Sequence, residues 1–323
     1  MTTDRLLADI GGTHARFAWQ AGPQTPLQDV QVQPTAAHDG IEAAIDSYLR
    51  STDRQTPAQC AIAIATAITG DEVSMTNHPW RFSIRALQQR FGFEHLRVIN
   101  DFTALALALP LLRPDMLVPV GGGAPRPGCT IALIGPGTGL GVSGLVPVSS
   151  TDGRTTWAPL QGEGGHVTLA AHDEREDALL AVLRRRYGHV SAERALSGPG
   201  LTNLHSAVVV LDQGRPPDVE WSAPQITQGA RSGDAACRAA LDHFCAFLGS
   251  VTGDLALTLG ALGGVYIGGG IVPRLGEDFR RSAFRQRFEA KGRFASYLAA
   301  IPVHVIDANA SPALLGAGRA LDP

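Results

Sequence analysis

The chain has 323 residues, which exceeds the usual size of one hydrophobic core, so two lobes are expected. Its net charge is −3 and 18% of its residues are charged, which offers no basic surface for nucleic acid or an anionic membrane. No apolar run approaches the ~20 residues that span a bilayer, and no signal peptide precedes the first strand pattern. A cytoplasmic protein that acts on small molecules is therefore expected.

The first half of the chain alternates strand and helix patterns. Residues 6–19, LLADIGGTHARFAW, predict a strand, a glycine turn and a second strand. Asn100 and Asp101 end a later apolar strand, where α/β folds place active sites. Helix capping is the simpler explanation of either residue alone, although one can cap while the other does chemistry. The remaining elements expected here are a helix over 40–50, a strand over 60–68, a helix over 84–91, a strand over 96–99 and a helix from about 102.

The second half repeats the plan of the first. Residues 131–148, IALIGPGTGLGVSGLVPV, again predict a strand, a glycine turn and a strand, which suggests a duplicated α/β architecture with a cleft between lobes. The turn-rich residues 118–128 are the expected crossing between the lobes. The later elements expected are helices over 174–187 and from about 235, a strand–glycine–helix segment over 263–275, a strand over 303–306 and a helix over 313–321.

The two glycine turns, Gly11-Gly12-Thr13 and Gly137-Thr138-Gly139, suit a polyphosphate, because glycine backbone N–H groups and threonine hydroxyls can approach an anion. A plain hairpin turn would explain either glycine turn alone, but it does not explain why the same turn occurs in both halves of the chain. Asp9 could orient Mg²⁺ through water. Lys291 is the only lysine and follows no P-loop, so ATP would be held without a lysine. Residues 139–144 match GxGxxG, but a strand pattern follows them, which excludes the dinucleotide fingerprint.

Three weaker features lie in the second half. Glu163 and His166 share a glycine-rich loop and could converge on a polyol, with a turn as the alternative. Glu193 follows the expected N-cap Ser191, and capping alone would explain it. The triplet of residues 268–270 would let a flat nucleoside pack closely, or make a tight turn. Two cysteines on one helix pattern, Cys237 and Cys245, are expected to be buried core thiols rather than ligands.

Together these segments closely resemble the bacterial glucokinases, sugar kinases of the superfamily that includes actin-like ATPases and hexokinases. The resemblance covers nearly the whole chain, in order. The matching segments are ADIGGTHAR, AIAIATAITGD, MTNHPW, VINDFTALA, GPGTGLGV, GEGGHV, HVSAERALSGPGL, GGVYIGGGIVPR, KGRF and LLGAG.

The resemblance implies a two-lobed, duplicated actin-like sugar-kinase fold with a central cleft. The small lobe would span residues 1–110, completed by a C-terminal helix within 303–323, and the large lobe would span residues 111–302. It also implies the substrates glucose and ATP, the cofactor Mg²⁺ and a homodimer. The implied sugar-binding residues are Asn100, Asp101, Glu163, His166 and Glu193, with Asp101 as catalytic base. The implied nucleotide-binding residues are Ala8, Asp9, Ile10, Gly11, Gly12, Thr13, Gly137, Thr138, Gly139, Gly268, Gly269 and Gly270.

The chain departs from the family pattern at His14, Ala67 and Gln161, none of which is an implied contact. Residues 167–200 contain no cysteine, so the zinc of the related repressor–kinase group is not expected. The alternative function is a non-catalytic sugar or nucleotide sensor on the same fold, and Asp101 together with both phosphate turns argues against it. An actin-like ATPase that binds protein would leave the sugar-binding set unexplained.

Overall fold

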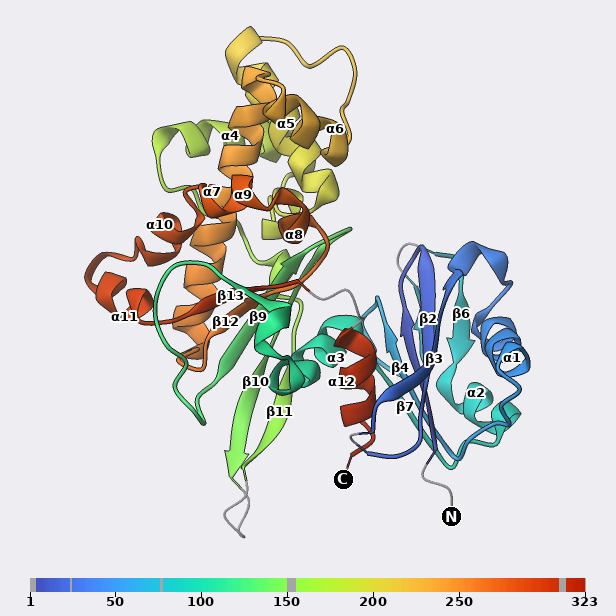
Figure 1. The fold of residues 1–323 in the computed structure, drawn as a ribbon. Coiled ribbons are helices and arrows are strands. Elements are labelled where there is room, and N and C mark those ends of the chain that lie inside the picture. Colours follow the sequence, from blue (N-terminus) through green and yellow to red (C-terminus); the bar gives the residue numbers. More distant parts are fainter. Residues whose placement is uncertain (1–3, 24, 76–77, 150–154, 308–311, 323) are drawn as a thin grey trace. The chain divides into compact units, whose positions relative to one another are not determined.

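The structure is a computed structural model that describes residues 4–23, 25–75, 78–149, 155–307 and 312–322. The chain divides into two compact units (Figure 1), of which the first is Met1–Pro114 with Ala308–Pro323 and the second is Asp115–Asp307. Residues 76 and 77 of the MTNHPW segment, and residues 308–311 and 323 of the expected C-terminal segment, lie outside the described residues. Within the described part, no helix is both long and apolar enough to cross a membrane.

A five-stranded sheet forms the first unit. The order is β3-β2-β1-β4-β7, in which β1, β2 and β3 pair antiparallel while β1, β4 and β7 run parallel. The carboxyl ends of β1 and β7 therefore lie at the same edge, one strand apart. The strands are β1 (Arg5–Ile10), β2 (His14–Gln20), β3 (Leu27–Pro34), β4 (Gln59–Ile64) and β7 (His95–Asn100), with a separate hairpin of β5 (Glu72–Ser74) and β6 (Arg81–Ser83).

Helices cover both faces of this sheet because β1 is apolar on both sides. Leu6, Ala8 and Ile10 face the core shared with α1 (Ile41–Ser51) and α2 (Ile84–Phe91). Leu7 faces the opposite way, toward α3 (Asp101–Ala108) and α12 (Pro312–Arg319). Asp9 alternates with Ala8 and Ile10, so its side chain belongs to the face that carries α3.

The last helix returns to the first unit and lies beside α3 (Figure 1). The two helices touch at their backbones, because a Cβ added at Gly316 would stand 1.6 Å from the carbonyl oxygen of Ala104. Only glycine permits this approach, so α12 fixes the position of the helix that begins at Asp101.

A six-stranded sheet forms the second unit, in the order β11-β10-β9-β12-β13-β8. Without the edge strand β8, its order and directions repeat those of the first sheet, which accounts for the two strand–glycine turn–strand segments of the sequence. The strands are β8 (Leu117–Pro119), β9 (Ile131–Pro136), β10 (Leu140–Ser149), β11 (Thr155–Gln161), β12 (Val265–Ile267) and β13 (Val303–Ile306).

Helix α7 is the centre of the second unit's helical layer. It packs against α5, α6 and α10, and Cys237 and Cys245 are buried on it, as expected. Gly249 lets α10 approach closely, since a Cβ there would stand 2.3 Å from the carbonyl oxygen of Phe284. The helices are α4 (Glu174–Tyr187), α5 (Gly198–Gln213), α6 (Ala223–Arg231), α7 (Ala235–Leu259), α8 (Ile271–Leu275), α9 (Glu277–Arg280), α10 (Phe284–Glu289) and α11 (Ala295–Ala299).

Three boundaries differ from the sequence prediction. Strand β4 ends at Ile64 rather than at residue 68. Strand β13, expected to join the small lobe from residue 303, pairs with β12 and β8 in the second sheet. Because β8 is itself part of that sheet, the change of unit falls after Pro114 rather than within residues 118–128. Strand β8 has three residues and lies at a sheet edge, so it carries little periodic signal, and its pairing with β13 has no local sequence pattern.

Candidate active site

The first glycine turn joins β1 to β2. The N–H of Gly11 donates to the carbonyl of His14 at 2.9 Å, which closes the turn. The hydroxyl of Thr35 donates to the carbonyl of Gly11 at 3.0 Å, and the side chain of Thr13 is exposed. The turn is thus held by hydrogen bonds while its threonine stays accessible, an arrangement that suits a phosphate group.

Asp9 lies at the end of β1, immediately before this turn. Asp9 is only 9% exposed, and its Oδ2 accepts a hydrogen bond from Arg16 Nη1 at 3.3 Å across the β1–β2 pair. An ionised carboxylate at the rim of a phosphate turn could orient a hydrated Mg²⁺, which favours carboxylate and water oxygens.

Asn100 and Asp101 lie where β7 passes into α3. Asn100 is the N-cap: its Oδ1 accepts from the N–H of Phe102 at 2.9 Å and of Thr103 at 3.2 Å. Its Nδ2 donates to Oδ1 of Asp101 at 3.0 Å. Asn100 therefore does the capping, and Asp101, the first residue of the helix, is available for chemistry.

The electrostatic surroundings of Asp101 suit a general base. Burial, reinforced by the negative charge of Asp9, raises the pKa of Asp101 to about 6, against the opposing effect of hydrogen bonds from Phe102 and Asn100. A carboxylate whose pKa lies near the working pH is a better proton acceptor than one that ionises near pH 4. The two carboxylates come together because the ends of β1 and β7 share one sheet edge.

The raised pKa predicts a pH dependence. A base must be ionised to accept a proton, so kcat/KM should fall as the pH drops through about 6, by about tenfold for each unit below it. The measurement is kcat/KM between pH 5 and 8, with stability checked at each pH. A profile that stays flat to pH 5 would contradict this protonation scheme.

The second glycine turn joins β9 to β10 in the second unit. Gly137 N–H donates to the carbonyl of Gly139 at 2.8 Å, and the carbonyl of Gly137 accepts from Gly198 at the start of α5, also at 2.8 Å. The Ser197 hydroxyl caps α5 by accepting from Gly200 N–H at 2.9 Å. The positive end of a 16-residue helix thus adjoins the turn, which favours an anion there.

The only lysine takes no part in either turn. Lys291 Nζ forms an ion pair with Oδ1 of Asp254 on α7 at 2.6 Å. Residues 139–144 begin the strand β10 rather than a helix, so the GxGxxG match is not a dinucleotide site, as predicted.

A cavity of about 620 Å³ in the second unit is lined by Gly137 and Thr138 of the second turn. Its other walls come from α5, from α6, and from α8 with its N-cap Gly270. Its volume falls in the range of small-molecule sites. Apolar side chains such as Leu201 and Ile271 lie beside polar groups from α6, a lining that suits a flat ring carrying polar substituents.

The triplet of residues 268–270 has two roles. Gly268 N–H donates to the carbonyl of Ile134 at 2.8 Å. Gly269 has a φ of +76°, and a Cβ there would stand 2.4 Å from the carbonyl oxygen of Pro136, so only glycine fits. Of the three, Gly270 lines the cavity. The first two therefore shape the strand-to-helix turn, and the third faces the ligand space.

The residues matched to sugar binding in the second unit converge on the start of β10. Oε2 of Glu193 accepts from Leu140 N–H at 2.9 Å. Glu163 and His166 are exposed. Gly165, between them in the loop, packs against β10, since a Cβ added there would stand 2.1 Å from the Leu140 carbonyl oxygen. The backbone of one residue therefore holds the glycine-rich loop and Glu193 beside the second turn.

The short helices that carry these residues are tied together. They are Gly164–His166 and Ala192–Arg194, and the N–H of Ala192 donates to the carbonyl of Val167 at 2.8 Å. Ser191 occupies the N-cap position, as expected, but its side chain makes no capping bond. Capping therefore does not account for this segment; the carboxylate of Glu193 is turned to Leu140.

The structure places the predicted residues in two sets. The first unit contains residues 8–13, Asn100 and Asp101. The second unit contains the remaining predicted residues. Within the first set Asp9 and Asp101 interact, and within the second Glu193 contacts the glycine turn.

Sequence reasoning missed the cavity wall formed by α6. Thr227, Gln228 and Arg231 line the cavity from this helix, and Arg274 does so from α8. Arg231 is held by Asp278 at 2.9 Å. These positions form the polar side of an ordinary amphipathic helix, so nothing in the sequence pattern distinguishes them from solvent-facing residues.

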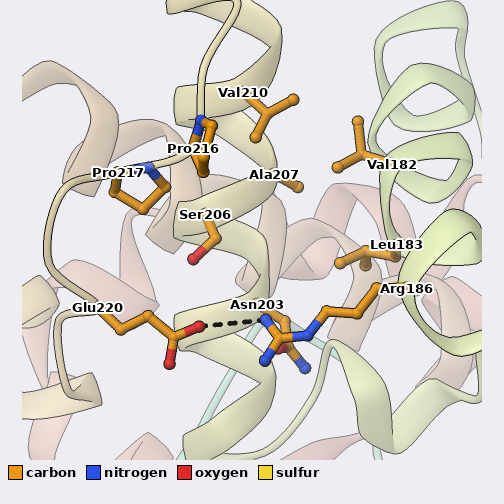
Figure 2. Close-up of a pocket in the computed structure, with 10 residues that line it drawn as sticks. All are labelled: Val182, Leu183, Arg186, Asn203, Ser206, Ala207, Val210, Pro216, Pro217 and Glu220. Carbon is orange, nitrogen blue, oxygen red and sulfur yellow. Dashed lines mark hydrogen bonds and ion pairs between the residues drawn. The ribbon is translucent and has the colours of Figure 1, made fainter.

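A second cavity in the same unit is lined by α4, α5 and the segment after α5 (Figure 2). Its volume of about 200 Å³ is below the usual size of small-molecule sites. Figure 2 shows an ion pair at its margin, where Arg186 Nη1 lies 3.2 Å from Oε1 of Glu220. Neither glycine turn lines this cavity.

Two sheets of one topology, each with a glycine turn, define the class of two-unit α/β sugar kinases. The family model for glucokinase matches residues 6–323. The chain belongs to the glucokinase family.

The similarity extends over nearly the whole of this chain. The chain is 53% identical to a glucokinase from Aromatoleum aromaticum, over 99% of this chain and 95% of that protein. It is 49% identical to a bifunctional protein from Paraburkholderia xenovorans, over 98% of this chain but only 48% of that longer protein. A crystal structure of glucokinase from an Antarctic psychrotroph superposes with a TM-score of 0.87, at 36% identity and with 99% of each chain covered.

Proposed function

We propose that the chain transfers the γ-phosphoryl group of ATP to the 6-hydroxyl of glucose, with Asp101 as general base. The family membership makes glucose phosphorylation the activity. The observation that carries the assignment of the base is a partly buried carboxylate whose pKa is raised to about 6, at the start of α3 and beside Asp9.

The sugar would be held by residues of both units. Asn100 positions the hydroxymethyl group, and Glu163, His166 and Glu193 bind the other hydroxyls. Asp101 accepts the proton as the 6-oxygen forms its bond to the γ-phosphorus. The bond from that phosphorus to the bridging oxygen breaks, and ADP departs with the electron pair. Positioning and charge neutralisation supply most of the rate acceleration in such transfers.

The nucleotide would occupy the 620 Å³ cavity of the second unit, and the glycine turns at 137–139 and 8–13 would bind its phosphates. Asp9 fits a role toward Mg²⁺, since its carboxylate lies at the end of β1 beside the first turn, where oxygen ligands suit this ion. Mg²⁺, when bound with ATP, would neutralise the negative charge of the phosphates. In the absence of a lysine at either turn, backbone N–H groups and the hydroxyls of Thr13 and Thr138 would supply the remaining contacts.

The test is a coupled assay that follows ADP with ATP and glucose, compared with mannose, fructose and N-acetylglucosamine. We expect turnover with glucose that disappears when Mg²⁺ is omitted and returns when it is restored. A protein that binds glucose in a calorimeter yet releases no ADP would instead be a non-catalytic sensor, which is the alternative function. Turnover independent of Mg²⁺ would contradict the role given to Asp9.

Two further features are part of the proposal. The reaction would take place in the cytoplasm, because ATP is the phosphoryl donor. The chain would form a homodimer, which the resemblance to the family implies. Sedimentation equilibrium over a range of concentrations distinguishes dimer from monomer.

A further inference from the structure

A cluster of three possible metal ligands lies in the second unit, apart from the residues assigned to glucose and ATP. It consists of His205 on α5, Asp234 at the N-cap of α7 and Cys237 in the first turn of α7. One ligand atom from each side chain lies within 4.8 Å of the other two. Sequence reasoning treated Cys237 as a core thiol; it is buried, but it also faces a histidine and a carboxylate.

The cluster contains a buried polar atom that the protein does not satisfy. His205 is 5% exposed, and among the described residues its Nδ1 has no hydrogen-bond partner. A buried, unpaired ring nitrogen is costly unless something binds it. The ring cannot easily turn away, because it stacks on Trp221 with the centroids 5.6 Å apart and the planes at 16°.

The other two ligands are also held in place. Oδ1 of Asp234 accepts from the N–H of Cys237 at 2.8 Å, which caps α7. Gly229 of α6 lies directly over the thiol, since a Cβ there would stand 2.7 Å from Cys237 Sγ. Asp234 is exposed, whereas the histidine and cysteine are buried, so an ion could enter from the solvent side at the carboxylate.

The donor set is one nitrogen, one sulfur and one oxygen. Zinc accepts all three kinds of ligand, at roughly 2.0–2.3 Å, which places neighbouring ligand atoms about 3–4 Å apart in a tetrahedron. The separations here are within 4.8 Å, so movements of about an ångström would close the site. Mg²⁺ prefers an all-oxygen octahedral environment and suits this set poorly.

Metal binding needs the thiolate form of Cys237, because the deprotonated sulfur is the ligand. Binding therefore forms a metal–sulfur bond, breaks the S–H bond and releases the proton to solvent.

We propose that His205, Asp234 and Cys237 bind one zinc-class divalent transition-metal ion, with water in the fourth position. The ion would tie α5 to the start of α7 behind α6, the helix whose opposite side lines the nucleotide cavity. It would supply no chemistry to the phosphoryl transfer, because the three ligands include none of the residues assigned to substrate or ATP.

The test uses the whole protein, stripped with a chelator and titrated with Co²⁺. We expect one Co²⁺ per chain, with a thiolate-to-cobalt charge-transfer band and the intense visible bands of tetrahedral cobalt, both abolished by Zn²⁺. Cys237→Ser should lose the charge-transfer band. The matched control is Cys245→Ser, a change at the other buried cysteine of α7, and it should retain both bands. Retention of the band in Cys237→Ser, or its loss only in the control, would overturn the assignment.

A second measurement needs no variant. Calorimetric titration of the wild-type protein with Zn²⁺ in two buffers of different ionisation enthalpy should show release of about one proton per ion, since the thiol ionises on binding. It should also show a rise in Tm. No binding, or binding without proton release, would refute a site that includes Cys237.

Discussion

Replacing Asp101 by Asn is expected to lower kcat by about 10²–10⁴-fold, the usual contribution of a general base. Asparagine keeps the size of the side chain, and its carbonyl oxygen can still accept the hydrogen bonds that Oδ1 receives from Phe102 and Asn100. The variant should fold normally and bind glucose with only modest loss. The measurements are kcat from the coupled assay and glucose affinity by calorimetry.

The structure offers a matched control for this variant. Asp71 precedes β5, and its carboxylate reaches the start of α2, where its Oδ1 accepts from the N–H of Arg85 at 2.9 Å; it is not among the site residues. Asp71→Asn should leave kcat within about twofold, since helix capping by Asn and Asp is nearly equivalent. Equal and near-normal turnover in both variants would show that Asp101 is structural and that the base is another residue.

The largest expected effect on stability concerns a buried ion pair that joins three helices of the second unit. Arg287 of α10 binds Glu176 of α4 through two contacts, at 2.5 and 3.0 Å, and donates to the Ser250 hydroxyl of α7 at 2.8 Å. Glu176 is 1% exposed. Glu176→Leu would leave a buried guanidinium without its counter-ion, which should lower the free energy of unfolding by about 3–5 kcal/mol. For a unit of this size, that corresponds to a fall in Tm of roughly 6–20 °C.

Two comparisons separate loss of the ion pair from a general effect of substitution. The double variant Glu176→Leu with Arg287→Met removes both charges and should recover much of the loss, because apolar replacements of buried pairs are often near neutral. Glu220→Leu breaks the exposed pair with Arg186 and should cost less than about 1 kcal/mol. Thermal unfolding of all four proteins is the measurement. If Glu176→Leu proved as stable as Glu220→Leu, the buried ion pair would not be important for stability.

Much of the fold was predictable from the sequence, because its long elements are strongly periodic. The helices at Ile84–Phe91 and Glu174–Tyr187 and both strand–turn–strand segments occur where the pattern indicated them. Strand β8 escaped notice because three residues at a sheet edge carry no period. Its pairing with β13 also moved that strand into the second unit, a long-range effect that no local pattern encodes.

The site residues were accessible to sequence reasoning only where special backbone chemistry marks them. Glycine turns and a polar pair at a strand end are visible signals, and they led to Asp9, Asn100 and Asp101. The wall that α6 gives to the cavity proposed for the nucleotide carries no such mark, because Thr227 and Gln228 are ordinary residues for a helix surface. The relation of Glu193 to Leu140 joins positions 53 residues apart and depends on tertiary packing.

The ion pair between Lys291 and Asp254 has a practical consequence for handling the protein. Since Lys291 is the only lysine, its Nζ is the only side-chain amine available to an amine-reactive reagent. Neither glycine turn contains a lysine, so acetylation of lysine leaves the charge of both turns unchanged. Attachment through Lys291 would use one defined side chain, which does not line the cavity beside Gly137 and Thr138.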